Sequence, residues 1–263
     1  MKNIPTISII GFGRFGKVLY KLLKDDFTIT LFQRHPINNA LLSKNTRVAT
    51  SLTDVYSSDV IFFACPMESF EQVVMEQKEY FRNDQLLIDV LSVKSLPAKI
   101  FAKVLAGTKT RALLTHPMFG PESSRKGFTK LNIVVNQFSA TKQEFNFWKN
   151  FFIMKELNVI EMSPKGHDKT IAHTQALTHF IGRLVDSMDI RSTSINTPTF
   201  TKLLEIRESI CKDTEQLFRN MQTMNTHSGR MRKKLKIRFN KLFDSLENSS
   251  DTITKGEKHD KHK

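Results

Sequence analysis

The fold class is indicated most clearly by one segment near the start of the chain, Ile7-Ser8-Ile9-Ile10-Gly11-Phe12-Gly13-Arg14-Phe15-Gly16. A short apolar run precedes glycines with the spacing G-x-G-x-x-G, and residues 14–25 then carry apolar side chains at helical intervals. A strand, a tight glycine turn and a helix in this order aim backbone N–H groups at a phosphate. An ordinary glycine-rich turn is the alternative. Because three of the ten glycines of the chain lie in this turn, we favour a phosphorylated ligand.

The rest of the first half alternates strand and helix signals. Apolar runs predict strands at residues 28–33, 60–64, 86–90, 112–115, 133–135 and 158–160. Helices are predicted between most of them, at residues 68–81, 96–105 and 141–152. This alternation predicts an α/β fold, with an N-terminal Rossmann-type doubly wound parallel sheet.

The second half has a different character. Residues 165–188, 199–224 and 229–246 carry helical patterns with no strand signal between them. We therefore expect three parts: a dinucleotide-binding domain at residues 1–162, a helical substrate and dimerisation domain at 163–247, and a disordered basic tail at 248–263. The helical part is too short to bury its apolar faces alone, which predicts a homodimer.

Charge and composition narrow the function further. The 263 residues carry a net charge of +14, which would suit nucleic acid, an anionic membrane or an acidic ligand. Eleven Lys and Arg residues against five acidic ones place +6 of this charge in residues 229–263, where we expect a docked amphipathic helix and the tail. Two distant cysteines, no apolar run of membrane length and no signal peptide predict a cytoplasmic protein, with no nucleic acid and no membrane as partner.

The predicted cofactor is a nicotinamide dinucleotide. An NAD site usually places an acid at the end of the second strand, whereas this chain has Gln33, Arg34 and His35. Arg34 can pair with a 2′-phosphate, so we expect NADP, with NAD as the alternative. The alternative for Arg34 itself is a solvated residue at the end of the strand. The full set of predicted cofactor residues is Gly11, Phe12, Gly13, Arg14, Phe15, Gly16, Gln33, Arg34, His35, Cys65 and Pro66.

A histidine is the best candidate for a catalytic base. His116 follows a strand of the predicted sheet, and ligands in doubly wound folds bind beyond the carboxyl ends of the strands. An imidazole there suits removal of a hydroxyl proton during hydride transfer. Ser92 follows the preceding strand and is predicted either to support this contact or to cap the next helix.

The first helix of the second half carries a polar stripe. His167, Ile171, Gln175, His179 and Arg183 recur at intervals of four residues along the helix predicted over 165–188. Amide, imidazole and guanidinium groups on one face favour an anionic substrate, and Arg183 could pair with a carboxylate. A solvated helix face is the alternative. No spacing typical of a metal site is present, so no metal is expected.

Three segments resemble one enzyme family. They are His116-Pro117-Met118-Phe119-Gly120-Pro121-Glu122-Ser123, Asp89-Val90-Leu91-Ser92-Val93-Lys94, and Gly166-His167-Asp168 with the run Gln175-Ala176-Leu177-Thr178-His179-Phe180-Ile181-Gly182-Arg183. They are similar to prephenate and arogenate dehydrogenases, and Ser194-Ile195-Asn196-Thr197-Pro198 extends the likeness toward plant-type arogenate enzymes. The resemblance covers residues 4–243.

The resemblance implies oxidative decarboxylation of arogenate or prephenate in tyrosine biosynthesis. It implies His116 as the catalytic base, Ser92 as its support, and a substrate site drawn from the helical part. The substrate-binding residues expected from the stripe and the resemblance are Ser123, His167, Gln175, Thr178, His179, Arg183 and Arg207.

Some features depart from the family pattern or leave alternatives open. Position 124 is Ser where the plant-type pattern has Gly, and Arg183 and Arg207 are rival partners for the substrate carboxylate. Another Rossmann dehydrogenase acting on a β-hydroxy acid is the alternative enzyme, but such enzymes use a lysine base on the helical domain. A non-catalytic basic nucleic-acid-binding protein is the alternative from another class.

Overall fold

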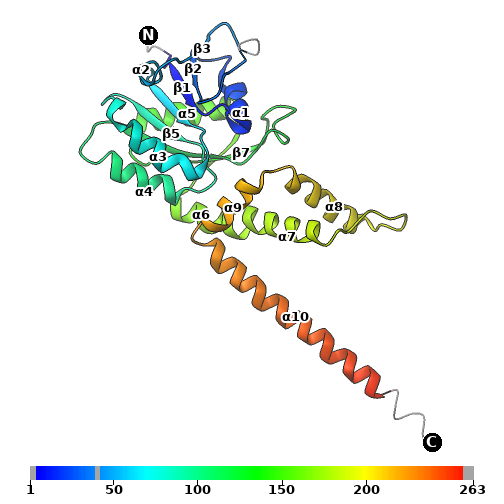
Figure 1. Ribbon diagram of the computed structural model, residues 1–263. Coiled ribbons are helices and arrows are strands. Elements are labelled where there is room, and N and C mark those ends of the chain that lie inside the picture. Colours follow the sequence, from blue (N-terminus) through cyan, green and yellow to red (C-terminus); the bar gives the residue numbers. More distant parts are fainter. Residues whose placement is uncertain (1–3, 39–41, 257–263) are drawn as a thin grey trace, which may run out of the picture. The chain divides into compact units, whose positions relative to one another are not determined.

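The computed structural model describes residues 4–38 and 42–256 of the chain (Figure 1). It contains two compact units. The first, called the sheet unit, ends at Asp168, and the second, called the helical unit, begins at Lys169. The boundary of 162/163 expected from the sequence lies six residues before this division.

One eight-stranded sheet organises the sheet unit, with the strand order β3-β2-β1-β4-β5-β6-β7-β8. The strands are β1 (Ile7–Ile10), β2 (Ile29–Phe32), β3 (Thr46–Val48), β4 (Val60–Phe63), β5 (Leu86–Asp89), β6 (Arg111–Pro117), β7 (Asn132–Asn136) and β8 (Asn158–Glu161). From β3 to β6 all pairs are parallel, which confirms the predicted doubly wound sheet. The expectation of a wholly parallel sheet is wrong at one edge, because β7 pairs antiparallel to β6 and β8 follows the direction of β7.

The strand order reverses at β1, which lies between β2 and β4. From β1 the chain proceeds outward to β2 and β3, and it then returns to continue on the other side with β4 and β5. Loops that leave neighbouring strands in opposite directions open a crevice at their carboxyl ends. The glycine loop after β1 and residues 64–66 after β4 therefore meet at the point where such sheets bind ligands.

Helices cover both faces of the sheet, and β4 shows why. Its side chains alternate, so that the ring of Phe62 lies 5.1 Å from Trp148 on one face, while the ring of Phe63 lies 5.6 Å from Phe70 on the other. The helices of this unit are α1 (Arg14–Leu23), α2 (Leu52–Tyr56), α3 (Met67–Gln77) with the 3₁₀ turn Lys78–Tyr80, α4 (Ser95–Val104) and α5 (Lys142–Met154). A near-continuous apolar strand is thus explained by burial on both sides.

Two short elements were not predicted. β3 and α2 lie between the second and third predicted strands, where the sequence is rich in Thr, Ser and Asp. Ser51 and Asp54 form a capping box that starts α2, and Tyr20 of α1 contacts the start of β3 through Thr46. Capping and tertiary contacts hold these elements, whose apolar periodicity is weak.

The helical unit contains α7 (Gln175–Ser187), α8 (Pro198–Cys211), α9 (Glu215–Thr223) and α10 (Ser228–Gly256), while α6 (Pro164–His173) carries the boundary between the units. Two predicted helices are each broken in the structure. The helix expected over 165–188 breaks at Thr174, whose φ and ψ are −116° and −94°. The one expected over 199–224 breaks before Thr214, whose hydroxyl caps α9. At Gly182 an added Cβ would lie 3.0 Å from Ile210, so this glycine allows α7 and α8 to approach closely.

The C-terminal helix α10 is longer than expected. It continues to Gly256, into the segment 248–263 where we expected a disordered tail, and residues 257–263 lie outside the described part. Its first turn packs on α7 and α9 through Met231, Ala176 and Met221. The expected docking does not continue beyond this turn within the chain, because Phe239, Leu242 and Leu246 are 58%, 63% and 62% exposed. None of the described helices is both long enough and apolar enough to cross a membrane.

Candidate active site

The glycine loop has the backbone geometry that a phosphate-binding turn requires. Gly11 has a φ of +100°, and a Cβ there would lie 2.6 Å from the carbonyl oxygen of Ala64. At Gly16 a Cβ would overlap the carbonyl oxygen of Gly11, so strand and helix pack closely at this point. Gly13 is different: it is exposed, and an added Cβ would meet no atom within 4 Å. The loop is closed on the protein side and open on the side where a pyrophosphate would approach.

The amino-terminal end of α1 is free to serve such a ligand. Gly13 is its N-cap and supplies no side-chain hydrogen bond, and the first turn contains no acidic residue. An uncapped helix N-terminus attracts anions through its N–H groups and the helix dipole. The side chains of Phe12 and Phe15 take part in packing instead, since Phe12 lies against Tyr20 and Phe15 against Phe119.

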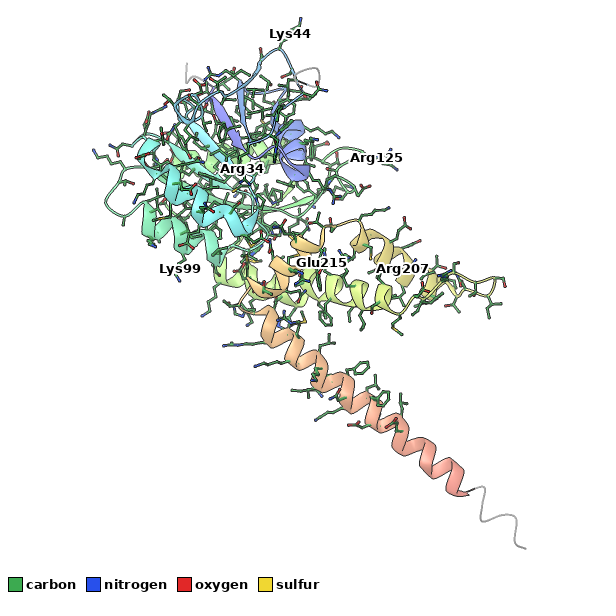
Figure 2. The ribbon with its side chains drawn as sticks, viewed as in Figure 1. Arg34, Lys44, Lys99, Arg125, Arg207 and Glu215 are labelled. Atoms are coloured by element: carbon green, nitrogen blue, oxygen red, sulfur yellow. The ribbon has the colours of Figure 1, made fainter. Side chains whose placement is uncertain are left out.

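The end of β2 carries basic residues and no acid. Arg34 and His35 are exposed, and Gln33 donates a hydrogen bond to the carbonyl oxygen of Pro36 at 3.3 Å. Arg34, labelled in Figure 2, is thus available to an anionic group near the second strand. After β4, Cys65 is a free thiol whose pKa burial raises to about 12, and the exposed Pro66 is the N-cap of α3. This cysteine is therefore protonated and unreactive at neutral pH.

His116 lies inside strand β6, which is longer than predicted. The strand was expected to end at Thr115, but antiparallel pairing with β7 extends it, with His116 opposite Val134. The imidazole is 3% exposed. Pairing with β7 fixes the position of this side chain at the carboxyl edge of the sheet.

His116 is joined to two residues from α6. Its Nδ1 lies 2.8 Å from Nε2 of His167, and Nδ1 of His167 lies 2.8 Å from Oδ1 of Asp168. His167 and Asp168 are both fully buried. Asp168 also accepts hydrogen bonds from the backbone N–H groups of Lys94 at 2.7 Å and Ser95 at 2.8 Å. These bonds connect the base to the start of α4.

Burial and charge set the protonation of this group. Burial, the neighbouring His167 and the Lys94 ammonium together hold the pKa of His116 well below the usual value of 6.5. Burial alone would raise the pKa of Asp168, but hydrogen bonds from His167, Ser95 and Lys94 outweigh it and the pKa is lowered. His116 is therefore a neutral imidazole and Asp168 a carboxylate at neutral pH.

A buried ion pair lies beside His116. Lys94 donates to Oδ2 of Asp89 and, at 2.5 Å, to the carbonyl oxygen of Thr115. Thr115 in turn donates its hydroxyl to the carbonyl oxygen of Asp89 at 2.6 Å. Burial raises the pKa of Asp89 and lowers that of Lys94, while their mutual attraction opposes both shifts. The pair connects β5, β6 and the start of α4.

The two serines predicted for the site differ in their surroundings. The hydroxyl oxygen of Ser92 is buried and, within the described part of the chain, has no hydrogen-bond partner. Ser123 is exposed, and its hydroxyl accepts from the N–H of Gly120 at 3.0 Å. Ser92 can thus receive a ligand, whereas Ser123 closes the turn in which it lies.

The polar stripe is divided by the break at Thr174. His167 lies on the sheet-unit side of this break, with both ring nitrogens bonded and no exposed surface, so its predicted contact with substrate stays a prediction. Gln175, His179 and Arg183 remain together on α7. Each has one buried atom with no hydrogen-bond partner among the described residues: Oε1 of Gln175, Nδ1 of His179 and Nε of Arg183. Thr178, on the same helix, is exposed and donates to the carbonyl oxygen of Thr174 at 3.1 Å.

Both candidate arginines of the helical unit already have partners. Arg183 donates to the carbonyl oxygen of Asp213 at 2.8 Å and lies 3.8 Å from the carboxylate of Glu215. Arg207 donates to the carbonyl oxygen of Ile190, in the loop after α7. Figure 2 labels Arg207 and Glu215 in this unit. His179 lies 3.7 Å from Asp213, but burial is the largest effect on its pKa, which is lowered.

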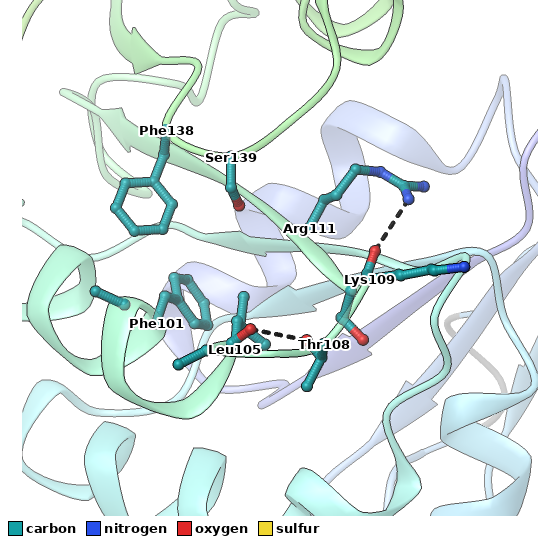
Figure 3. A pocket seen from close by; sticks show the side chains of 10 residues that line it. Phe101, Leu105, Thr108, Lys109, Arg111, Phe138 and Ser139 are labelled. Carbon is teal, nitrogen blue, oxygen red and sulfur yellow. Dashed lines mark hydrogen bonds between the residues drawn. The ribbon is translucent and has the colours of Figure 1, made fainter.

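A surface depression lies at the opposite edge of the sheet. Phe101, Leu105, Thr108 and Arg111 are among its lining residues, near the amino end of β6 (Figure 3). It shares no residue with the predicted site. Among the residues that the structure describes, no group of three acidic, His or Cys side chains could hold a metal ion.

Three buried polar residues near His116 were not among the predicted site residues. Asp89, Lys94 and Asp168 are fully or almost fully buried, and all three connect to His116 or to its strand. The available signal was an acid at the end of an apolar strand, followed by a lysine five residues later. A charge in such a run needs a buried partner, which points to a polar cluster.

Comparisons with known proteins agree with this architecture. Residues 33–151 match the model of "Prephenate dehydrogenase, nucleotide-binding domain", and residues 184–258 match "TYRAAT1-like, C-terminal domain". Arogenate dehydrogenases 1 and 2 of Arabidopsis thaliana, both chloroplastic, are each 29% identical over 249 residues, or 91% of this chain. The chain spans 39% of the length of the first and 69% of the second.

Solved structures share the fold. Prephenate dehydrogenase from A. aeolicus, in complex with hydroxyphenyl propionate and NAD+, superposes with a TM-score of 0.74 at 19% identity, covering 95% of this chain and 93% of that one. Synechocystis arogenate dehydrogenase gives a TM-score of 0.67 at 14% identity, covering 93% of each chain. In its matched nucleotide-binding domain, in its sequence over most of its length and in its fold, the chain is similar to prephenate and arogenate dehydrogenases.

Proposed function

We propose that this chain catalyses the oxidative decarboxylation of arogenate or prephenate, with NADP as hydride acceptor. The observation that carries the proposal is His116: a neutral, buried imidazole at the carboxyl edge of the sheet, held through one ring nitrogen. The other nitrogen, Nε2, has no hydrogen-bond partner in the described part of the chain. Such a group can take the proton of a substrate hydroxyl.

Different residues of this chain would bind the cofactor and transfer the proton. The open glycine loop fits a pyrophosphate, and a bound NADP would supply the hydride acceptor. As the hydride leaves the ring carbon, Nε2 of His116 takes the proton from the hydroxyl on that carbon. The bond to the ring carboxylate breaks and carbon dioxide leaves. The electron pair of that bond passes through the ring to the former hydroxyl oxygen, which takes the proton back from His116. The unpartnered hydroxyl of Ser92 would hydrogen-bond the substrate hydroxyl or the base.

The preference for NADP rests on charge at the end of β2. Arg34 and His35 are exposed and no acid lies among residues 32–37, so nothing there repels a 2′-phosphate. Arg34 would pair with that phosphate through two N–H groups. An acid that would bond the ribose hydroxyls of NAD is missing from this segment.

The helical unit carries further candidates for substrate binding. Gln175, His179 and Arg183 present unpartnered polar atoms on one face of α7, and Thr178 and Arg207 are further candidates. An unsatisfied buried polar atom in a folded protein calls for an explanation, and a hydrogen-bonding ligand gives one. Arg183 keeps one N–H without a partner, which favours it over Arg207 for the substrate carboxylate.

A steady-state assay tests the function directly. The purified chain is mixed with arogenate or prephenate and with NADP or NAD, and cofactor reduction is followed at 340 nm. We expect turnover with at least one of the substrates and a higher kcat/KM with NADP. A folded protein that binds cofactor but turns over neither substrate would overturn the proposal.

We further propose a homodimer in which a second copy covers α10. Phe239, Leu242 and Leu246 lie on one face of this helix and are exposed, and a helix without packing partners is marginal in water. The double variant Phe239→Glu, Leu242→Glu should shift the mass measured by light scattering from dimer to monomer. Ile237→Glu is the matched control, because Ile237 is also exposed (57%) but points roughly 200° away from Phe239 around the helix. A monomeric wild-type protein would refute the dimer.

The compartment stays a prediction. Both cysteines are free, as expected for a reducing environment. The two plant relatives carry the word chloroplastic in their names, and the cytoplasmic location expected from the sequence is not tested by the fold.

A further inference from the structure

We propose that His167 and Asp168 are positioning residues that hold His116 in the tautomer with its proton on Nδ1, leaving Nε2 as the proton acceptor. The inference rests on the proposed function and deepens it, because it names the atom that accepts the proton and the residues that select it. It stands on an unbroken line of contacts: Asp168 to His167 at 2.8 Å and His167 to His116 at 2.8 Å.

The proton positions follow from the Asp168 end of this line. Asp168 accepts hydrogen bonds from the backbone N–H groups of Lys94 and Ser95, at 2.7 and 2.8 Å. Peptide N–H groups can only donate, so both bonds favour the carboxylate form, which can only accept. The contact between Asp168 and His167 must then be donated by Nδ1 of His167.

The proton on Nδ1 of His167 determines the proton position on His116. An imidazole that carries its single proton on Nδ1 presents a lone pair at Nε2. Two lone pairs facing each other at 2.8 Å would repel, so Nδ1 of His116 must carry a proton and donate it. Nε2 of His116 is left with the lone pair that a base requires.

Burial protects this arrangement from water. His167 and Asp168 are fully buried and His116 is 3% exposed, so solvent offers no competing partner to their ring nitrogens. Asp168 also bonds the first residues of α4, which fixes its carboxylate at two points besides His167. A network with few rotational options selects one proton arrangement.

The charges around His116 act in opposite directions once it has taken a proton. The groups that face it are His167 and Asp168 from α6, Lys94 at the start of α4, and Asp89 at the end of β5, which is paired with Lys94. The Lys94 ammonium disfavours a second positive charge on His116. Asp168, acting through His167, is the carboxylate that compensates an imidazolium at His116.

Asp168→Asn tests the inference with a small change. The amide can still accept from Lys94 or Ser95, but its NH₂ group donates toward Nδ1 of His167. Both histidines then reverse, and Nε2 of His116 carries a proton and cannot act as base. In Ser-His-Asp enzymes the corresponding change lowers kcat by about 10⁴-fold, and we expect a loss of about 10²–10⁴-fold. KM for NADP should stay within about twofold, because no step of the argument touches the cofactor.

A purely structural role would not produce the next two results. The acid limb of the kcat/KM profile should move to lower pH in Asp168→Asn, because the compensating negative charge is gone. Nitrogen-15 NMR of the imidazoles should show His116 as the Nδ1–H tautomer in the wild-type protein and as the Nε2–H tautomer in the variant. A wild-type His116 with its proton on Nε2 would overturn the inference, and so would an Asp168→Asn enzyme with full kcat.

The controls separate folding from positioning. Asp59→Asn removes a carboxylate that accepts from the N–H and hydroxyl of Thr6, at the other edge of the sheet, and should leave kcat unchanged. His167→Phe keeps a ring of similar volume but removes the acceptor for His116, and should lower kcat while the variant still binds NADP. The NMR measurement needs no substrate, so it decides the tautomer even if neither substrate is turned over and the proposed function fails.

Discussion

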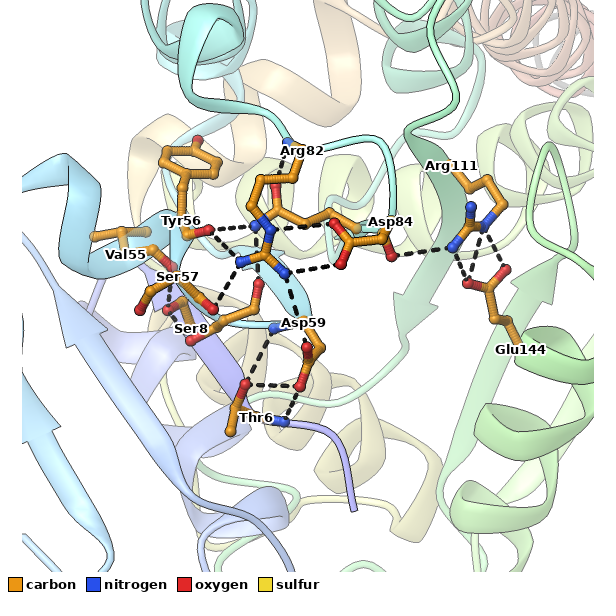
Figure 4. Close-up of polar contacts among 12 residues, drawn as sticks. Thr6, Ser8, Val55, Tyr56, Ser57, Asp59, Arg82, Asp84, Arg111 and Glu144 are labelled. Atoms are coloured by element: carbon orange, nitrogen blue, oxygen red, sulfur yellow. Dashed lines mark hydrogen bonds and ion pairs between the residues drawn. The ribbon is translucent and has the colours of Figure 1, made fainter. Parts of the chain in front are cut away.

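The two edges of the sheet use polar residues in different ways. At the amino edge, Arg82 donates to the carbonyl oxygens of Tyr56 and Ser57 and to Asp84, and Thr6 donates to Asp59 (Figure 4). These groups are half-exposed and bonded to one another. At the carboxyl edge, the polar groups are buried, and Oδ1 of Asp89 and the hydroxyl of Ser92 have no partner among the described residues.

The polar residues of the two edges differ in how well their hydrogen-bonding groups are satisfied. The amino edge pairs its charges where solvent screens them, so each pair contributes little but leaves nothing unsatisfied. The carboxyl edge buries a charge pair, two histidines and an open glycine turn, and its unsatisfied atoms lower stability unless a ligand bonds them. The buried atoms without partners at the carboxyl edge support the ligand site proposed there.

Removal of the base should give the largest effect. His116→Asn keeps a polar side chain but removes the proton acceptor, so kcat should fall about 10²–10⁴-fold, while the dissociation constant for NADP measured by fluorescence stays the same. In the wild-type protein, the lowered pKa of His116 keeps the imidazole neutral below pH 6.5. Activity should therefore be lost only as pH falls through that lowered pKa. A variant that retains most of its kcat would show that the carboxyl edge does not hold the base at this position.

The next effect compares one ion pair from each edge. Lys94→Met leaves Asp89 buried without its partner, and we expect the free energy of unfolding to fall by about 3–5 kcal/mol. Arg111→Met is the matched change at the amino edge, where Arg111 pairs with Glu144 and both side chains are about a quarter exposed. This variant should lower the free energy of unfolding by about 1 kcal/mol. Urea denaturation of both variants gives the comparison, and equal costs would contradict the distinction between the edges.

The smallest expected effect concerns the cofactor. Arg34→Ser removes the guanidinium from the end of β2, and the ratio of kcat/KM for NADP to that for NAD should fall about tenfold. Lys99→Ser, which removes an exposed charge from α4, is the control for general attraction of anions and should leave the ratio unchanged. An unchanged ratio in Arg34→Ser would place recognition of the 2′-phosphate elsewhere.

The sequence predicted the parts of the fold that depend on local pattern. The glycine spacing and the apolar runs were enough for the parallel part of the sheet, and the position of His116 after such a run placed it at the carboxyl edge. The reversal at β7 has no local signature, because strand direction depends on how the chain returns. The break at Thr174 was missed for the same reason: residues 165–188 have an unbroken helical pattern, and no proline or glycine marks the kink.

The support of the base was the hardest part to predict. His167 and His179 have similar places in the amphipathic pattern, yet His167 bonds His116 while His179 lies near Asp213. Periodicity assigns a residue to a helix face but not to the partner which that face meets. Buried polar clusters are therefore visible only once segments about 50 residues apart in sequence are brought together.

The division of the chain at Asp168 has a consequence for how this protein could change over time. On the proposed function, His116, the two residues proposed to orient it and the buried ion pair all lie in the sheet unit. Substitutions in the helical unit would then leave the proton-transfer step unaltered. Selection between an amino and a keto substrate would then proceed through one unit, while the chemistry common to both is inherited unchanged in the other.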